Sequence, residues 1–199
     1  MKGSWELITR KSRLEGGLIT LLTSESGHRL LSWLDCLNAA QSGDWNGIAG
    51  CEDFILVCNG QAPGTRVRAG AWGGVFKDKE WVDGSFPVKV IDYPENHKSP
   101  GEQVAEVMYW VDWALDQEHP ILIATHSTFV LCTLVNCQLK DKLDRLEHWR
   151  DTYRFYCIEE DGKFRDMAGE DGLLSKNPMN GCMGELLEEQ YRILREGNR

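Results

Sequence analysis

VKVIDYPENHKSPGEQ at residues 88–103 and PILIATHSTFVL at residues 120–131 decide the fold of this chain. Each stretch contains a short apolar run, Val88–Ile91 in the first and Ile121–Ala124 in the second, which predicts two buried strands. An amphipathic helix predicted over 100–117 joins the two strands. A strand–helix–strand unit of this kind is a parallel crossover, and open α/β sheets carry their ligand sites at the carboxyl ends of such strands.

Polar side chains follow both apolar runs at the point where each strand ends. Asp92 follows the first run, and Thr125, His126 and Ser127 follow the second. A carboxylate oxygen is the ligand that Mg²⁺ prefers, and a histidine at the next strand end is placed to contact a terminal phosphate. The pattern therefore predicts a site for a phosphate and a metal at this sheet edge.

These residues resemble two motifs of the ABC-type ATPases of the RecF, SMC and OLD-nuclease group. The Walker B segment of that group typically reads D-E-P-E-x-x-L-H-P and precedes a strand that ends in T-H-S. This chain has Asp92-Tyr93-Pro94-Glu95, followed later by Thr125-His126-Ser127. The resemblance implies a P-loop NTPase-like core, with Asp92 as the Mg²⁺ ligand and His126 as the residue that contacts the γ-phosphate of ATP.

Composition limits the classes of function. The length of 199 residues fits one domain, and the net charge of −9 argues against a large nucleic-acid surface. We therefore expect no direct binding of nucleic acid, and an acidic surface favours association with proteins. The sequence has no apolar run near the ~20 residues of a membrane span, and its start lacks a signal-peptide core, which predicts a cytoplasmic protein without membrane contact.

Seven cysteines are scattered along the chain, and none forms a C-x-x-C pair. Several lie in apolar runs, so we expect reduced and mostly buried thiols instead of a disulfide framework or a zinc site.

The order of predicted elements is typical of an α/β domain with a largely parallel sheet flanked by helices and with additional antiparallel hairpins. We predict strands at Trp5–Thr9, 18–23, Phe54–Cys58, 88–91, Ile121–Ala124, 153–159 and 163–167, and helices after 27 and over 100–117, 128–136 and 183–195. Under the resemblance, residues 1–199 form one domain with a Walker A-like region at 18–38, a Gly/Trp-rich β insertion at 60–86, a Walker B and switch region at 87–137, and a C-terminal hairpin and helix at 150–196.

The phosphate-binding loop of the family is degenerate in this chain. A P-loop needs G-x-x-x-x-G-K-[ST], because its glycines let backbone N–H groups wrap the phosphates and its lysine neutralises their charge. The corresponding turn has a single glycine, Gly27, and His28 or Arg29 is the available substitute for the lysine. Glu25 would repel a phosphate. The plain alternative is an ordinary strand-to-helix turn that Ser26 caps.

The catalytic position is also altered. The family places a water-activating glutamate after the Walker B aspartate, and this chain has Tyr93, whose phenol is a poor base near neutral pH. Glu95, two residues further on, is the available substitute for that glutamate. The alternative is that Glu95 has a local role in the turn before the helix. His126 has a structural alternative as well, namely hydrogen bonding through one ring nitrogen.

A third motif of the family, a Ser-Gly pair that opens a helix before Walker B, is not recognisable in the sequence. The helical arm that carries it is reduced or absent, and the Gly/Trp-rich segment stands in its place. Trp110 and Trp113 lie on the predicted middle helix, where we expect one to face the core and one the surface. An exposed tryptophan would favour an interaction face, and packing is the alternative.

The three losses agree with one another and lead to a hypothesis of a catalytically inactive pseudo-ATPase that acts through protein–protein contacts. It would serve as a regulatory subunit or decoy inhibitor of an ABC-type P-loop ATPase, and a phage- or mobile-element-encoded antagonist of bacterial antiviral defence would fit. No cofactor is then expected. One alternative is a divergent ATPase that binds ATP and Mg²⁺ through Asp92 and His126. The other is a self-associating structural protein, a homo-oligomer without an ATPase partner.

Overall fold

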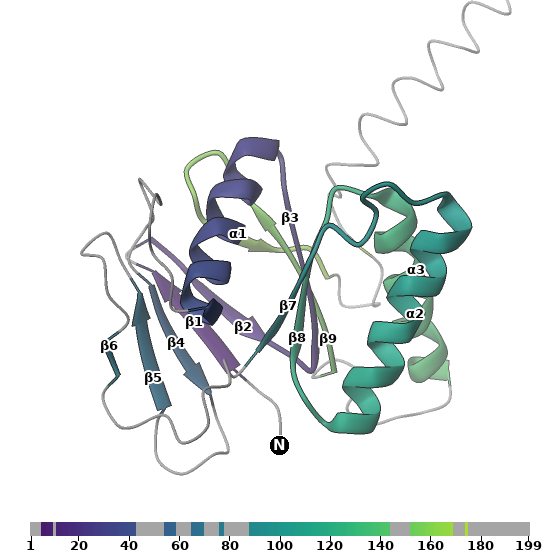
Figure 1. The fold of residues 1–199 in the computed structure, drawn as a ribbon, viewed down its shortest axis with the longest axis horizontal. Coiled ribbons are helices and arrows are strands. Elements are labelled where there is room, and N and C mark those ends of the chain that lie inside the picture. Colours follow the sequence, from purple (N-terminus) through teal and green to yellow (C-terminus); the bar gives the residue numbers. More distant parts are fainter. Residues whose placement is uncertain are drawn as a thin grey trace, which may run out of the picture.

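The computed structural model describes residues 5–9, 11–42, 54–58, 65–69, 76–77, 88–143, 152–168 and 174. Within these ranges the strands form two five-stranded sheets, which three helices accompany (Figure 1). One sheet is antiparallel throughout, and the other is mostly parallel. The predicted α/β class, with a largely parallel sheet and additional antiparallel strands, is confirmed at this level.

The antiparallel sheet has the strand order β2-β1-β4-β5-β6. Its strands are β1 (Trp5–Thr9), β2 (Arg13–Gly16), β4 (Phe54–Cys58), β5 (Thr65–Ala69) and β6 (Phe76–Lys77). Trp5 lies opposite Gly16 in the β1–β2 hairpin, is 1% exposed, and donates from its indole nitrogen to the Gly17 carbonyl at 3.0 Å. A Cβ at position 16 would come within 2.0 Å of the indole ring, so this close approach requires glycine.

The mostly parallel sheet has the strand order β10-β9-β3-β8-β7. Its strands are β3 (Ile19–Ser24), β7 (Lys89–Asp92), β8 (Ile121–Ala124), β9 (Tyr153–Ile158) and β10 (Phe164–Asp166). Every residue of β3 and β8 is buried, because both sheet faces are covered, and this explains the unbroken apolar run of β8. β10 returns antiparallel to β9 through a turn at Gly162, whose φ of 85° favours glycine.

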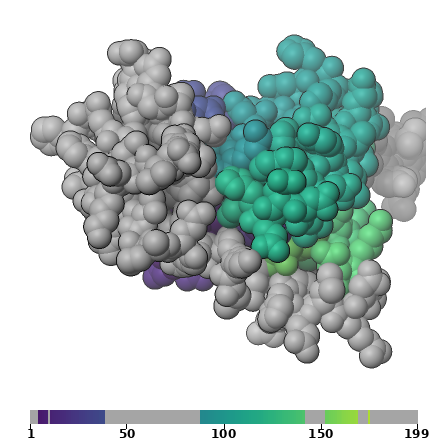
Figure 2. Space-filling model, turned by 60° about the horizontal axis from the view of Figure 1, so that its bottom comes forward, coloured from purple at the N-terminus to yellow at the C-terminus, as the bar shows by residue number. Residues whose placement is uncertain are grey.

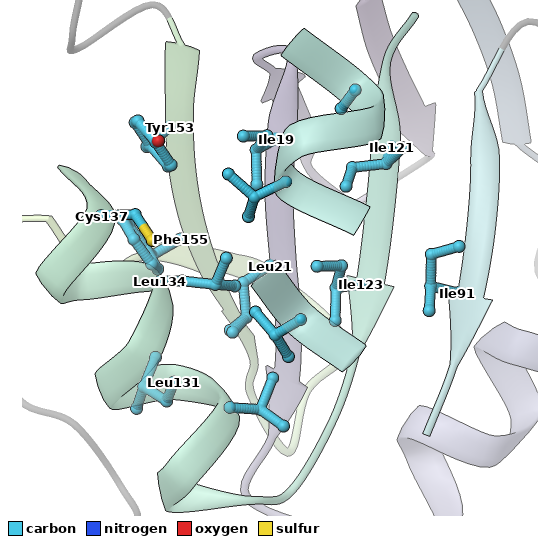
Figure 3. Packing of buried hydrophobic residues seen from close by; sticks show 14 of the residues in the cluster. Ile19, Leu21, Ile91, Ile121, Ile123, Leu131, Leu134, Cys137, Tyr153 and Phe155 are labelled. Carbon is cyan, nitrogen blue, oxygen red and sulfur yellow. The ribbon is translucent and has the colours of Figure 1, made fainter. Parts of the chain in front are cut away.

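Two separate apolar cores lie on the two faces of this sheet. Leu22 and Leu122 pack with α1 (Gly27–Ser42) and with inward-facing residues of the antiparallel sheet. Leu21 and Ile123 belong to a second core with α2 (Pro100–Gln117) and α3 (Thr128–Leu143), part of which Figure 3 shows. Figure 1 shows α1 on one side of the sheet and α2 and α3 on the other.

The α2 helix begins with a complete set of helix-start signals. Ser99 is the N-cap, its hydroxyl oxygen accepts from the Glu102 N–H, and Glu102 in turn accepts from the Ser99 N–H at 2.7 Å. Pro100 follows the cap, where its missing N–H costs nothing. The predicted bounds of this helix, 100–117, are confirmed.

Several element predictions need correction. Arg13–Gly16, which was not assigned a strand, forms β2, and α3 continues to Leu143 instead of ending near 136. Helical spacing predicts that Val104 and Leu115 face the core together with Val107 and Val111, but Val104 and Leu115 are 37% and 42% exposed while Ala114 is fully buried.

Residues 44–50 and 59–64, whose composition predicts a loop and a turn, lie outside the described residues, and so does the predicted helix at 183–195. Within the Gly/Trp-rich segment at 60–86, the described parts are β5 and β6, which agree with the predicted short β structure.

The cysteines differ in state. Cys132, Cys137 and Cys157 are free thiols, but Cys36 is disulfide-bonded, so the expectation of reduced thiols throughout is wrong at that position. Among the described residues, the helices are too short or too polar to cross a bilayer.

Candidate functional site

Three strand ends with polar residues meet at one edge of the parallel sheet. Ala124 of β8 pairs with Leu22 of β3 on one side and with Asp92 of β7 on the other. The pairing continues past the strand ends, because the Thr125 N–H donates to the Leu22 carbonyl at 3.1 Å and the Tyr93 N–H donates to the Ala124 carbonyl at 3.0 Å. The backbone segments predicted to form the site are therefore neighbours.

The turn between β3 and α1 is fastened to the end of β9. The Ser24 hydroxyl and the Glu25 N–H both donate to the Ile158 carbonyl, at 3.2 Å and 3.4 Å. The Glu25 carboxylate forms an ion pair with Arg165 of β10 at 3.3 Å. The Glu25 N–H is thus engaged by the protein, and so is the Ser26 N–H, which donates to the Ser24 hydroxyl at 3.1 Å. This differs from a loop whose amides wrap a phosphate.

The first turn of α1 holds the three residues predicted as the loop remnant. Gly27 starts the helix, His28 is exposed, and Arg29 is half-buried. Ser26 precedes the helix as predicted for a cap, but its hydroxyl lies 2.7 Å from Nδ1 of His28. A Cβ built on Gly27 would lie 3.8 Å from Nε2 of His126, so this helix start and the β8 strand end face each other.

His126 and Glu95 form the most constrained part of the site. The His126 N–H donates to Oε1 of Glu95 at 3.0 Å. Nε2 of His126 and Oε2 of Glu95 are both buried, and neither has a hydrogen-bond partner among the described residues. Burial lowers the pKa of His126, and the nearby Glu95 opposes that shift, so the imidazole is held neutral near pH 7. Two buried polar atoms without partners are costly and mark this spot as unusual.

Tyr93 is the residue that the resemblance aligns with a catalytic glutamate. Its φ is 42°, in the left-handed region, which is unfavourable for a bulky residue and doubly so before Pro94. The Tyr93 ring packs on the imidazole of His126 with centroids 5.8 Å apart and an interplanar angle of 31°. Burial, together with the nearby Asp92 and Glu95, raises the pKa of the phenol, which makes Tyr93 a still poorer base.

The Asp92 carboxyl group lies near the middle of α1. Burial raises the pKa of its carboxyl group, a hydrogen bond from Asn38 opposes the shift, and the like charges of Asp35 and Glu95 add to it. Asn38 is eleven residues beyond Gly27, a distance of roughly 16 Å along a helix. The aspartate is therefore tied to a different part of α1 from the part that a phosphate would contact.

The residues that would hold Mg²⁺-ATP meet different parts of α1. Mg²⁺ bound to a nucleotide lies beside the phosphates, but the α1 residue that bonds Asp92 is Asn38, eleven residues beyond the start of that helix. In the described part of the chain, no three His, Cys, Asp or Glu side chains are grouped closely enough to hold a metal ion. We therefore derive no chemical step through a bound metal.

Several residues that build the site were not predicted. Asn38 and Asp35 of α1, Arg165 of β10 and the Gln103–Ser127 pair all act at this edge. The Ser127 hydroxyl lies 2.6 Å from Oε1 of Gln103 and joins the end of β8 to the start of α2. Helical periodicity places Asn38 and Asp35 on the helix but gives no sign of which strand end they meet.

Comparisons with known proteins do not add to this picture. No family model, no curated protein and no solved structure matches the chain. Function is therefore argued from the residues of the site.

Proposed function

We propose that this chain is a P-loop NTPase-like domain that does not hydrolyse ATP and acts by binding another protein. In this interpretation β3, β7 and β8 correspond to the Walker A, Walker B and switch strands of an ABC-type ATPase. The domain would be a regulatory subunit or a decoy inhibitor of such an ATPase. An inactive copy fits best as an inhibitor of bacterial defence that a phage or mobile element encodes.

The observation that carries the proposal is the position of the Asp92 carboxylate. Its hydrogen bond from Asn38 and the nearby Asp35 put it beside the middle of α1. Asn38 lies roughly 16 Å along the helix from Gly27, where the phosphates of a nucleotide would be expected. Hydrolysis needs metal, phosphate and base within bonding distance of one another, so this separation supports an inactive site.

Two further contacts support the same proposal. Arg165 forms an ion pair with Glu25 in the turn between β3 and α1. This contact gives the turn a structural role in place of phosphate binding. Tyr93 takes the place of the catalytic base, and its raised pKa keeps the phenol protonated near neutral pH.

Calorimetry with Mg²⁺-ATP and a phosphate-release assay test this proposal on the purified chain. We expect no binding up to millimolar nucleotide and no phosphate release above that of a buffer blank. Phosphate release that Asp92→Ala abolishes would overturn the proposal. The partner is tested separately by co-purification with candidate P-loop ATPases, followed by assay of the ATPase rate with and without the chain.

A second candidate function, nucleotide binding through Asp92 and His126, is favoured by one specific observation. Nε2 of His126 and Oε2 of Glu95 are buried without partners, and a ligand that supplies a donor and an acceptor would satisfy both. Binding of ATP that is weakened by His126→Gln and by Glu95→Gln, without turnover, would favour this candidate.

A third candidate is a self-associating structural protein. Light scattering distinguishes it from the first two, since only a self-associating protein forms oligomers in the absence of any partner.

A further inference from the structure

An aromatic strip runs along the outer side of α2, away from the candidate nucleotide site. Tyr109 packs edge-on against Trp110 with centroids 5.0 Å apart, and Trp110 packs edge-on against Trp113 at 5.8 Å. His119 extends the strip beyond the helix, with its ring 5.6 Å from that of Trp113. Tyr109 is 58% exposed, and both tryptophans are half-buried, so neither of them is a core residue as predicted for one. Figure 2 shows residues 88–143 as a continuous teal-to-green surface.

The strip already holds one cation. Nζ of Lys89, on β7, lies 4.9 Å from the ring centroid of Trp110 and 5.8 Å from that of Trp113. An ammonium over an aromatic face is attracted by the ring quadrupole. The two indoles are therefore arranged as a surface that accepts positive charge, and Lys89 of β7 already lies over both rings.

The helix that carries the strip is acidic throughout. The α2 sequence PGEQVAEVMYWVDWALDQ contains four carboxylates and neither lysine nor arginine. Glu102 serves the helix cap, and Glu106 pairs with Lys98 at 3.3 Å. Asp112 and Asp116 are exposed, and within the described residues neither forms an ion pair.

Asp112 and Asp116 are unfavourable for the helix itself. They are four residues apart, where like charges repel on a helix surface. Asp116 also lies in the last turn, which has no basic residue, and the helix dipole is negative at that end. These charges destabilise the helix and lie beside exposed aromatic rings. Such a combination is typical of a binding surface.

We propose that the C-terminal half of α2 docks a basic, arginine-containing segment of a partner protein on Tyr109, Trp110, Trp113, Asp112 and Asp116. Guanidinium groups stack on aromatic rings and pair with carboxylates, and they do both better than ammonium groups. Phosphate-bearing partners are disfavoured, because the carboxylates repel them. Burial and the nearby Lys89 lower the pKa of His119, which keeps its ring uncharged near neutral pH.

This inference rests on the proposed protein-binding function and specifies the chemistry of the partner. The two proposals fail separately. ATP turnover would overturn the proposed function and leave the docking surface intact, whereas loss of peptide binding would overturn the docking surface and leave the inactive site unaffected.

The test uses a fluorescently labelled nona-arginine peptide and the full chain, followed by anisotropy in about 0.1 M salt. We expect Asp112→Asn/Asp116→Asn to weaken binding by about tenfold or more, and Tyr109→Ala by about threefold. The control, Glu15→Gln/Glu160→Gln, removes the same net charge from exposed residues outside α2 and should change affinity by less than about twofold. Because the α2 change removes unfavourable charges, it should not lower the melting temperature.

Three outcomes would overturn the inference. The first is absence of binding by the wild-type chain. The second is an equal loss in the two double variants, which would show that net charge alone attracts the peptide. The third is a dimer in light scattering that is insensitive to salt and abolished by Tyr109→Ala, because the occupant of the strip would then be a second copy of the chain.

Discussion

The helices α1 and α2 both begin at the same edge of the parallel sheet, but their first turns are built differently. The start of α2 is satisfied within its own segment by the reciprocal bonds of Ser99 and Glu102. At the start of α1, the Ser26 hydroxyl bonds the His28 ring, and Gly27 faces a buried histidine nitrogen without a partner. The turn before α1 is held by the long-range bonds of Ser24 and Glu25 to the Ile158 carbonyl, whereas the start of α2 is capped within its own segment.

The largest effect is expected from removing the contact between Glu95, in the turn before α2, and His126, which follows β8 and faces the start of α1. In Glu95→Ala, the partly buried His126 N–H loses its acceptor, so unfolding should become easier by about 1–3 kcal/mol. Urea unfolding of the purified variant measures this loss.

Glu95→Gln is the matched control, because its amide oxygen can still accept the bond from His126. It should remain within about 0.5 kcal/mol of the wild type. Equal losses in the two variants would show that the negative charge, and not the acceptor, matters at position 95.

Removal of the two cap hydroxyls compares the helix starts directly. Ser99→Ala breaks the capping box and should cost about 1 kcal/mol of stability. Ser26→Ala removes a hydroxyl whose described partner is the His28 ring, and it should cost less than about 0.5 kcal/mol. Thermal unfolding in parallel measures the difference, and a larger cost at Ser26 would reverse the comparison.

The two starts also differ in how far the sequence predicts them. The Ser99-Pro100 pair with Glu102 is a local signal, so the start of α2 and its bounds could be predicted from the chain alone. The strand ends of Asp92 and His126 were predicted for the same reason, since apolar runs followed by polar residues are visible in sequence.

The partners of these residues could not be predicted. Asn38 meets Asp92 because α1 crosses the sheet toward β7, and Arg165 meets Glu25 because β10 folds back beside β9. Such crossings depend on packing angles between elements distant in sequence, which no local pattern encodes. The direction of the Asp92 side chain, on which the proposed function depends, belongs to this group.

Substitution of the glycine in the first turn of each helix, Gly27 in α1 and Gly101 in α2, tests the comparison further. Gly27→Ala places a Cβ 3.8 Å from Nε2 of His126, an ordinary contact, and Gly101→Ala in α2 meets nothing within 4 Å. Both changes should stabilise the chain by about 0.5 kcal/mol, because alanine favours helix over glycine. Denaturant unfolding tests this. A loss at Gly27 beside a gain at Gly101 would show that the α1 start needs glycine, as a phosphate-binding loop does.

The smallest effect is expected at Asp92, and its sign is informative. The pKa of its carboxyl group is raised by burial, so the folded state binds the proton more tightly than the unfolded state does. The charged carboxylate therefore lowers stability at neutral pH, and this penalty disappears as the pH falls below the ordinary carboxyl range. Asp92→Asn should raise the melting temperature slightly at pH 7 and leave it unchanged at low pH. A carboxylate preserved for Mg²⁺ would show the same gain in metal-free buffer, but added Mg²⁺ would then stabilise the wild type alone. Absence of that Mg²⁺ effect is expected if Asp92 serves α1 and not a nucleotide.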